Sequence, residues 1–452
     1  MSEVTASAEA AIPEDEESAV YRWYVVAVLT LCYALSFIDR QVLSLLVEPI
    51  KRDLILTDTE FSLLQGFTFA IFYTFIGLFM GKLADTKSRR WIIVVGVTAW
   101  SLMTACCGLA KNFFHLILAR VGVAVGEATL SPSAYSLIGD YFAPAKIGRA
   151  MSTYTVGVYL GSGLAFLVGG ALIAAIPEVS SLPIVGEVKA WQLVFIIIGL
   201  AGLPFALLAL TIKEPRRGRY VETKLGQQDD QPQVVSITRT LQFFVQNKRF
   251  YANHFFGFSM LTTVGYGFHS WVPAYFMRVH DWQASDVGVV YGTINVLAAP
   301  LGVLSGGWFG DFLSRRGHLD AFIRGPLIGA AFLWIPACLA TSGVTNDTTL
   351  IFALLTVLHF FASFHGGMAV AALHTVTPLQ MRGQATAAYL FVINLVGLGM
   401  GPLVVALITD YIFESEQSVG ASLSVVGLVA VPLAMLLLTL SMRHYRSMVA
   451  AT

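Results

Sequence analysis

Charged residues are scarce in this chain of 452 residues. Asp, Glu, Lys and Arg make up only 12% of the sequence, whereas soluble domains carry about 25%. Hydrophobic residues account for 56%, and the mean hydropathy is +0.71. A chain with so few charges cannot cover a large water-facing surface, so the composition predicts an integral membrane protein. The 28 Lys and Arg balance the 28 Asp and Glu, and no basic excess indicates a nucleic-acid partner.

Cysteine is rare as well. The four cysteines, Cys32, Cys106, Cys107 and Cys338, all lie within apolar runs, where a thiol packs like a small hydrophobic side chain. The sequence has no CxxC pair and no cluster of histidines, so we expect no disulfide framework, no metal and no bound cofactor. Because no spacing indicates a nucleophile with its base, we also expect a protein that is not an enzyme.

Basic residues are absent from the first twenty positions, where residues 14–17 are all acidic. A signal peptide begins with a basic segment and continues with an apolar core, so we expect residues 1–20 to form a disordered acidic tail. A membrane span needs about 20 apolar residues, and the chain contains twelve such runs. They cover approximately residues 23–49, 61–82, 91–110, 114–140, 149–176, 191–212, 250–277, 286–310, 322–341, 348–376, 384–412 and 421–442.

One long polar linker, residues 213–248, separates the sixth run from the seventh. We therefore expect two six-helix bundles, residues 21–212 and 249–446, with a short tail at 447–452. Most Lys and Arg lie on the side of the membrane that also holds both chain ends. Because basic residues are enriched in cytoplasmic loops, both termini are expected in the cytoplasm. The outer loops then contain Lys51, Arg52, Lys111, Lys189 and Arg278.

Two residues of opposite charge, Asp39 and Arg40, lie inside the first apolar run. An ionisable residue near the middle of a span costs at least about 2.5–3.5 kcal/mol, so the two must face a polar interior or each other. They could be a neutral ion pair that fixes one helix to its neighbour. They could also be separate functional groups, because neighbours diverge by about 100° around a helix. Arg120 and Glu127, seven positions apart in the fourth run, share one helix face.

The two halves contain a repeated segment. Residues 81–90 (GKLADTKSRR) follow the second run, and residues 307–316 (GWFGDFLSRR) follow the eighth. The Gly, the Asp, the Ser and both Arg recur at the same spacing, and we expect both segments to be short loops. A second match, Pro144 to Ala150 with Pro378 to Gly383, precedes the fifth and eleventh runs. Two matches at equivalent places predict a duplicated six-helix unit.

The repeated segments and the two sets of six runs resemble the major facilitator superfamily of secondary transporters. Arg120 to Ala128 (RVGVAVGEA) is similar to that family's second motif, and Gly157 to Gly170 to its glycine-rich fifth helix. The resemblance implies an all-α integral membrane fold with twelve transmembrane helices in two pseudo-symmetric six-helix bundles. It also implies alternating access in a multi-pass protein, which we expect to be a monomer in a bacterial inner (plasma) membrane.

Within that superfamily the sequence more closely resembles the Spinster family of lysolipid and sphingolipid transporters. The likeness rests on the first half: YALSFIDRQVL at 33–43, PIKRDL at 49–54, VGEA at 125–128, SP at 131–132 and DYF at 140–142. The family likeness implies a small amphiphilic or anionic substrate, together with protons and membrane lipid as partners. Drug or organic-anion transport by the same fold is the alternative that we carry forward.

The repeated segments are candidates for a gate. A short loop with charges of both signs can form ion pairs across the seam of two rocking halves. Asp85 could accept hydrogen bonds from the start of the eleventh helix, where free N–H groups favour an anion, while Arg89 and Arg90 hold acidic or carbonyl groups. Asp311 and Arg315 are the equivalents in the second half. The alternative is a charge cluster that only sets membrane topology.

The charged residues within the first half are candidates for coupling. A carboxyl group whose pKa is raised by burial and lowered by a guanidinium can titrate near the working pH. We expect Asp39 and Glu127 to exchange protons, and Arg40 to alternate between a carboxylate and an anionic head group, because its planar fork can hold two oxygens. Arg120 could be a structural anchor or a further substrate or coupling contact.

The second half offers neutral polar candidates instead. We expect Tyr266 and His269 to contact substrate, and Phe364 and Met368 to line an apolar cavity wall, although ordinary helix packing explains such residues equally well. Other polar or apolar options share this half: Asn295, Phe360, Phe361, His365, His374 and Asn394. A charged first half that faces a less polar second half suits an amphiphile, whereas a sugar site would require several facing Asn, Gln and aromatic groups. The sequence thus predicts a transporter driven by a proton gradient.

Overall fold

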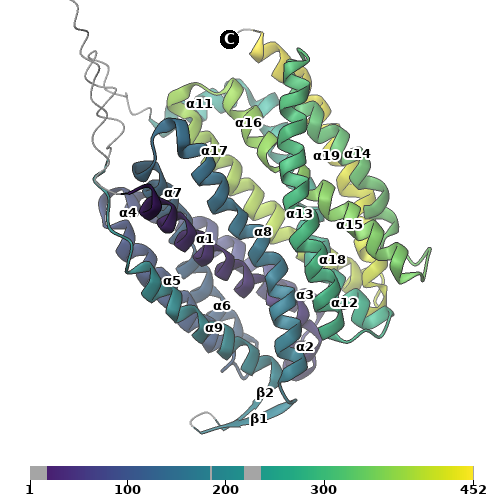
Figure 1. Cartoon of the computed structure of the whole chain (residues 1–452). Helices are drawn as coiled ribbons and strands as arrows, with labels where there is room; N and C mark the ends of the chain where they lie inside the picture. The colour runs from purple at the N-terminus through teal and green to yellow at the C-terminus, as the bar shows by residue number, and fades with distance from the viewer. Residues whose placement is uncertain (1–17, 184–185, 218–235, 451–452) are drawn as a thin grey trace, which may run out of the picture.

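The computed structural model describes residues 18–183, 186–217 and 236–450, so most of the predicted tail at 1–20 and the centre of the linker lie outside it. Its helices lie side by side in an elongated bundle (Figure 1). The first half contains these elements: α1 (Ala19–Gln41), the 3-10 segment η1 (Val42–Leu45), α2 (Val47–Leu54), α3 (Asp58–Ser62), the π segment η2 (Leu63–Phe67), α4 (Thr68–Thr86), α5 (Arg89–Cys107), α6 (Phe113–Glu127), α7 (Leu130–Tyr141), α8 (Pro144–Ala175), β1 (Val179–Leu182), β2 (Gly186–Lys189) and α9 (Ala190–Ala209).

A short helix, α11 (Ile237–Gln246), lies within the predicted linker and precedes the second half. The second half contains these elements: α12 (Lys248–Val279), α13 (Ala284–Arg315), α14 (Ala321–Leu339), α15 (Thr348–Phe364), α16 (Gly366–Val376), η3 (Leu379–Met381), α17 (Arg382–Val392), the π segment η4 (Ile393–Gly399), α18 (Met400–Tyr411), η5 (Glu416–Ser418) and α19 (Val419–Val449).

The all-α membrane fold is confirmed. Within the described ranges, eleven helical stretches are long and apolar enough to cross a membrane. The remaining predicted span is α12, a helix of 32 residues. Its histidine, asparagine and hydroxyl side chains explain why it does not reach the same hydropathy, and most of its length is buried against α19 and α18. The part of the chain that the structure describes thus contains twelve spans, six before the linker and six after it.

Two local predictions need correction, and one local element was not predicted. The repeated segments are helical rather than loops: residues 81–86 form the end of α4, and residues 307–315 form the end of α13. Neither contains proline, so nothing stops the helix before its polar end. An antiparallel hairpin, β1–β2, was not predicted between the fifth and sixth spans. The last helix continues to Val449, into the predicted tail at 447–452.

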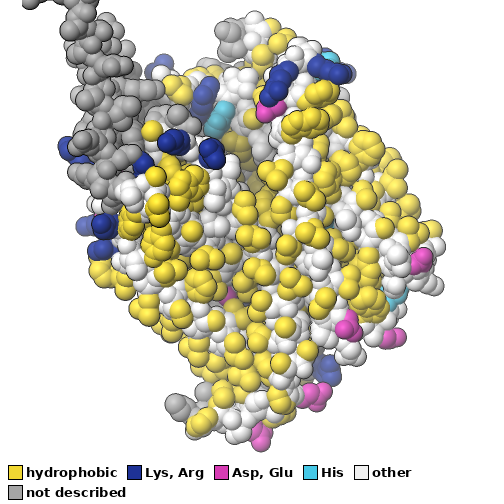
Figure 2. All heavy atoms as spheres, in the orientation of Figure 1, with side chains coloured by type: hydrophobic (Ala, Val, Ile, Leu, Met, Phe, Trp, Pro, Cys, Tyr) yellow, Lys and Arg dark blue, Asp and Glu magenta, His cyan; other side chains and the backbone are white. Residues whose placement is uncertain are grey.

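The two ends of the bundle differ in charge. We call the end with β1–β2 the hairpin face, and the opposite end, with residues 213–217 and α11, the linker face. In Figure 2 a broad belt of hydrophobic side chains separates them. Lys and Arg gather at the linker face in the upper part of this view, and Asp and Glu gather toward the hairpin face. This charge distribution is typical of a protein whose linker face is cytoplasmic.

Several spans are interrupted where they meet the centre of the molecule. The second and eleventh spans contain the π segments η2 and η4, which contact each other across the two halves. The tenth span breaks at His365, which is followed by two glycines. Irregular backbone at membrane depth occurs where it is buried in protein or lines a cavity. These interruptions therefore mark the region in which to look for a site.

The halves also meet along α8 and α13, which lie side by side through much of their length. Small residues bring the two backbones into contact. A Cβ atom added to Gly170 would lie 3.0 Å from the carbonyl oxygen of Ser285, and one added to Gly288 would lie 2.6 Å from that of Phe166. Gly163 and Gly170 of the glycine-rich fifth span thus pack against the second half, whereas Gly157 and Gly161 pack against α1 within the first half. Small residues commonly allow such close approach in membranes.

Candidate functional site

Arg40 forms a buried ion pair with Glu127. Its Nε donates to Glu127 Oε2, and the two side chains are 8% and 0% exposed. The two residues come from the end of α1 and the end of α6, which are far apart in the sequence. Among the described residues no ion pair joins Arg40 to the adjacent Asp39. The structural alternative of an Asp39–Arg40 pair is therefore wrong, and the two side chains have separate partners.

Asp39 lies deeper in the first half. Its Oδ2 accepts a hydrogen bond from Thr104 Oγ1 of α5 at 3.1 Å, while its Oδ1 is buried without a hydrogen-bond partner. Arg120 donates through Nη1 to the Asp39 carbonyl oxygen at 3.3 Å, and its Nε and Nη2 are buried and unpartnered. The four charged candidates of the first half are thus brought into one cluster of Asp39, Arg40, Arg120 and Glu127, which we call the charge cluster.

Aromatic rings surround the Arg40 guanidinium. Its central carbon lies 4.4 Å from the ring centre of Tyr73, 4.7 Å from Phe69 and 4.8 Å from Phe37. Each ring face attracts a cation, and the attraction strengthens when water is excluded. The rings therefore hold the guanidinium in place whether or not a carboxylate is bound to it, and they leave its fork available for an anion.

A break between α6 and α7 positions Glu127. The helix ends at this residue, and Thr129 Oγ1 donates back to the Gly126 carbonyl oxygen at 2.7 Å. Pro132 in the first turn of α7 has no N–H group, which prevents one continuous helix. Close packing on α5 fixes the break, since a Cβ atom added to Gly96 would lie 3.0 Å from the Gly126 carbonyl oxygen. Glu127 is therefore held at a rigid helix end.

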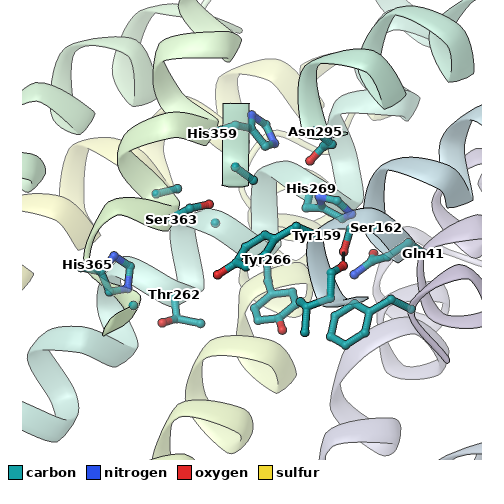
Figure 3. Close-up of a pocket in the computed structure, with 16 residues that line it drawn as sticks. Gln41, Tyr159, Ser162, Thr262, Tyr266, His269, Asn295, His359, Ser363 and His365 are labelled. Carbon is teal, nitrogen blue, oxygen red and sulfur yellow. Dashed lines mark hydrogen bonds between the residues drawn. The ribbon is translucent and has the colours of Figure 1, made fainter. Parts of the chain in front are cut away.

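A cavity of about 220 Å³ lies between the halves, next to the charge cluster. Phe37 and Gln41, which flank Arg40 in the first span, line it from the first half, and Tyr266 of α12 lines it from the second half. No Asp, Glu, Lys or Arg is among its 16 lining residues. Figure 3 shows its polar side chains, which come from both halves: Gln41, Tyr159, Ser162, Thr262, Tyr266, His269, Asn295, His359, Ser363 and His365.

The cavity contains some of the predicted second-half residues and not others. Tyr266 and His269 line it. Phe364 and Met368 do not: they pack on glycines of α13 and α14, with Met368 against Gly310 and Gly325. Phe364 and Met368 are therefore helix-packing residues, which was the alternative interpretation of them from the sequence. Phe360 and Phe361 line a second, apolar cavity of about 430 Å³ between α13 and α15.

A network of ion pairs joins the halves at the hairpin face. Arg278, at the end of α12, donates to both oxygens of Asp58 at 2.7 Å and to Glu48 at 2.7 Å. Lys51 bonds the same Asp58 and also Glu416 of the second half. We call these five residues the hairpin-face lock. Next to it, Asp410 accepts hydrogen bonds from the backbone and hydroxyl of Thr59 at 2.7 and 2.6 Å.

The predicted gate residues at the linker face are arranged differently. Buried Arg89 forms ion pairs with Asp140 of the first half and with Glu214 at the start of the linker, and neither contact reaches the second half. The Asp85 carboxylate is exposed and has no hydrogen bond or ion pair among the residues that the structure describes. Asp311 and Arg315 are exposed too. The expected contact of Asp85 with the eleventh span is not made in this conformation.

The segment after the sixth span fastens the first repeated segment. Arg217 donates to the carbonyl oxygens of Ala84 and Asp85 at 2.9 and 2.8 Å, which satisfies carbonyl groups at the end of α4 that have no partner within the helix. Glu214 accepts from Ser88, from Arg89 and from the Arg90 N–H. Burial opposes ionisation of Glu214, but these hydrogen bonds outweigh it and lower its pKa below the usual value of 4.5.

Sequence reasoning missed the hairpin-face lock and several cavity residues. Arg278 and Lys51 were counted only as outer-loop cations. Acidic residues lie near the same ends of other spans, and this could have predicted ion pairs with the two cations. Gln41, Tyr159, Ser162, Thr262, His359 and Ser363 gave no signal, because single polar residues in spans are common. In the described ranges no group of three or more His, Cys, Asp or Glu could hold a metal ion.

The family described as the Major Facilitator Superfamily matches residues 29–402. An MFS-type efflux pump of Mycolicibacterium smegmatis is 28% identical over 89% of this chain and 88% of its own length. A probable L-galactonate transporter of Escherichia coli K12 is 25% identical over 94% and 92%. The crystal structure of a bacterial homolog to the human lysosomal transporter Spinster, inward-facing and unoccupied, is 26% identical, with a TM-score of 0.74 over 96% of this chain and 98% of that one.

Proposed function

The chain belongs to the major facilitator superfamily of secondary transporters, and on this basis we propose that it couples a proton gradient to the movement of an amphiphile with an anionic head group. The observation that carries the proposal is the charge cluster: a guanidinium held by aromatic rings and paired with one of two buried carboxyl groups. Buried charges of this kind inside a membrane protein mark ion and substrate pathways.

The pairing of Arg40 with Glu127 provides a simple coupling mechanism. When Glu127 takes up a proton, its negative charge is lost, and Arg40 is left without a partner. An anionic head group can then replace the carboxylate on the guanidinium fork. One proton and one anion together replace one ion pair, so the buried charge stays balanced. Asp39, with one carboxylate oxygen unpartnered, is the second proton site.

Alternating access follows from the different contacts at the two faces. The hairpin-face lock holds the halves together at one end, and Asp85 is unengaged at the other. We take the moving bodies to be residues 21–212 and 249–446, with the linker 213–248 between them. The linker face and both termini lie in the cytoplasm, and the membrane is the bacterial inner membrane. One chain contains the whole cavity, so a monomer suffices. Asp85, Arg89, Arg90, Asp311 and Arg315 would close the linker face in the opposite conformation.

A lysolipid or sphingoid-like substrate is the first candidate. The similar solved structure is described as a homolog of a lysosomal transporter, Spinster. A cavity of about 220 Å³ is below the usual range of about 300–1,000 Å³ for ligand sites. Such a space suits a head group rather than a whole lipid, so the hydrocarbon chain would extend out of the cavity between the halves.

A small organic anion is the second candidate, and the cavity wall favours it. Neutral hydrogen-bonding groups from α8, α12, α13 and α15 surround the space, as a sugar-acid site would require. The probable L-galactonate transporter among the relatives is described as a carrier of such a compound.

Uptake into proteoliposomes tests the proposal. Lysophosphatidic acid and galactonate are supplied separately, with and without an imposed pH gradient. We expect saturable uptake that the gradient accelerates. Asp39→Asn and Glu127→Gln should each remove the acceleration, whereas Arg40→Gln should remove uptake itself.

Glu187→Gln, an exposed carboxylate in β2, is the matched control and should behave as wild type. If Asp39→Asn and Glu127→Gln both keep full gradient-driven uptake, the coupling proposal is wrong. Uptake of galactonate without uptake of the lysolipid would select the second candidate.

A further inference from the structure

The apolar cavity of about 430 Å³ between α13 and α15 lies apart from the charge cluster. We propose that it binds one hydrocarbon chain of a membrane phospholipid whose head group carries an ammonium, and we call it the lipid groove. None of its lining residues lines the cavity next to the charge cluster. The site is therefore separate from the substrate site and does not depend on which substrate the protein carries.

The lipid groove opens on the membrane-facing surface of the second half. Both of its helices belong to spans that can cross a membrane. Leu297, Leu301 and Val357 line it and are exposed, although all three lie well inside their spans. Exposed side chains at this depth contact the hydrocarbon core of the bilayer, which also surrounds the hydrophobic belt seen in Figure 2. The molecule that reaches the groove is therefore a lipid.

The lining of the groove suits a hydrocarbon chain rather than a head group. Its two polar side chains are Thr293 and Thr356. Their hydroxyls donate to the carbonyl oxygens of Val289 and Phe352, one turn earlier in the same helices, at 2.7 Å each. The groove thus offers methyl groups and aromatic rings. A polar head group placed there would lose its hydrogen bonds to water without replacing them.

The groove has one closed end. A Cβ atom added to Gly302 of α13 would lie 2.1 Å from the Phe360 carbonyl oxygen of α15, so the two backbones touch there. From this contact back to Thr293 the helix rises about 13 Å toward the hairpin face. A hydrocarbon chain in the groove consequently has its end near Gly302, and its head group lies at the hairpin face.

The apolar wall alone does not select a particular lipid. Lipid tails are as apolar as leucine, so a chain gains little by leaving other chains for the protein. Preference for one lipid must come from its head group. Trp282 indicates the level of the head groups, because tryptophan is enriched at membrane interfaces. Its ring lies 5.2 Å from that of Phe352, one turn before Thr356 of the groove.

Asp286 is placed to contact that head group. It lies in the first turn of α13, seven residues before Thr293, which puts it on the same helix face and about 10 Å away along the axis. Its carboxylate is exposed and has no hydrogen bond or ion pair among the residues that the structure describes. Exposed Asp281 precedes the same helix. Two carboxylates attract an ammonium and repel a head group with only negative charge, so the groove should prefer phosphatidylethanolamine to phosphatidylglycerol.

The lipid groove and the cavity next to the charge cluster lie on opposite sides of the same two helices. Ala298 lines the groove and Ala299 lines the cavity, and the same holds for Phe361 and Ala362. A chain in the groove therefore supports the wall of the other cavity from behind.

Photo-crosslinking in vesicles tests the proposal. The full-length protein is reconstituted in equal parts of phosphatidylethanolamine and phosphatidylglycerol, with a trace of one or the other that carries a diazirine on an acyl chain. Labelling of residues 293–301 is compared with labelling around Leu200, an exposed residue of α9. We expect the phosphatidylethanolamine probe to label the groove about two- to fivefold more than the phosphatidylglycerol probe, as for an exposed ion pair. Around Leu200 the two probes should label equally.

Two pairs of variants separate the head group from the chain. Asp286→Asn should remove the preference between the probes, whereas Glu178→Gln, on an exposed carboxylate of the first half, should keep it. Thr293→Phe places a ring in the groove and should lower labelling by both probes several-fold. Leu304→Phe, on the same helix but outside the groove, should leave labelling unchanged, and labelling around Leu200 shows that each variant is folded.

Three results would overturn the proposal. The first is equal labelling of the groove by the two probes in wild type, or stronger labelling by phosphatidylglycerol. The second is groove labelling that persists in Thr293→Phe. The third is labelling around Leu200 without labelling of the groove, which would show that protein rather than lipid covers it.

Discussion

Arg278 and Asp58 form a two-point contact between the halves of the protein: each carboxylate oxygen of Asp58 accepts from one terminal nitrogen of Arg278 at 2.7 Å. The residues are 220 positions apart, and they are 9% and 0% exposed. Planar pairing of this kind is among the strongest hydrogen-bonded contacts that side chains make. The hairpin face is therefore closed by a specific contact rather than by general packing.

The first prediction concerns Arg278→Gln. The change leaves Asp58 and Glu48 without their guanidinium, and breaking a buried pair costs about 3–5 kcal/mol. We expect the halves to separate at the hairpin face. Spin labels on exposed Glu187 and Val344, in a background without the four cysteines, should report longer distances than in the protein with Arg278.

Asp53→Asn is the control for that experiment. Asp53 is also at the hairpin face, but it pairs with Lys189 and Trp191 inside the first half. It should leave the distance between the labels unchanged. Equal distances with and without Arg278 would contradict the role of the lock.

The second prediction is a graded effect within the lock. Glu416 bonds Lys51 at 2.7 Å, but its side chain is 58% exposed. Exposed ion pairs contribute about 0–1 kcal/mol and weaken with salt. Glu416→Gln should therefore shift the same spin-label distances only slightly, and added salt should abolish the difference. A shift as large as that of Arg278→Gln would show that burial does not set the strength of these contacts.

A third prediction uses two glycines of the second span. A Cβ atom added to Gly66 would lie 2.8 Å from the Leu398 carbonyl oxygen of the other half, whereas one added to Gly77 meets nothing within 4 Å. Gly66→Ala should push the halves apart near η2 and η4 and favour opening at the hairpin face, as measured by access of a thiol reagent to a cysteine placed at Ser62. Gly77→Ala should have no effect. Equal access in both variants would argue against a close seam.

The fourth prediction concerns pH and Glu214. Its lowered pKa means that the folded protein binds this proton less readily than the unfolded chain. The stabilisation is therefore present above the usual glutamate pKa and is lost as the pH falls through the lowered value. Because Glu214 is partly exposed, we expect Glu214→Gln to cost about 1 kcal/mol or less at neutral pH.

Thermal unfolding at a series of pH values measures this effect. The difference between wild type and Glu214→Gln should shrink toward zero in acid. Glu178→Gln, on an exposed carboxylate, should match wild type throughout. A difference that grows in acid would contradict the assignment.

The spans and the charge cluster could be predicted because lipid restricts the possibilities so strongly. An apolar run of about 20 residues predicts a membrane span, and charged residues within such a run are easily recognised in the sequence. The contacts of Arg278 could not be predicted in the same way. A cation just beyond a span resembles any loop charge, and its partners lie about 220 positions away along the chain.

The sequence also could not predict which single residues of the second half line the cavity. Phe364 and His269 both lie on apolar helices, but packing decides which of them reaches the cavity. The Phe364 ring packs on Gly329 of α14, and the Phe364 backbone packs on Gly306 of α13, since Cβ atoms added at these glycines would collide with them. His269 instead lies in the cavity that α12, α13 and α15 line together. Helical periodicity alone does not fix such contacts.

The seam between α8 and α13 has a mechanical consequence. Around Gly170 and Gly288 the two helices touch through their backbones rather than through interlocked side chains. Because no side chains interlock there, the two helices can rotate against each other by several degrees without repacking of side chains. The two halves would then rotate against each other along this seam, and the ion pairs of the hairpin-face lock would break at one end of the movement.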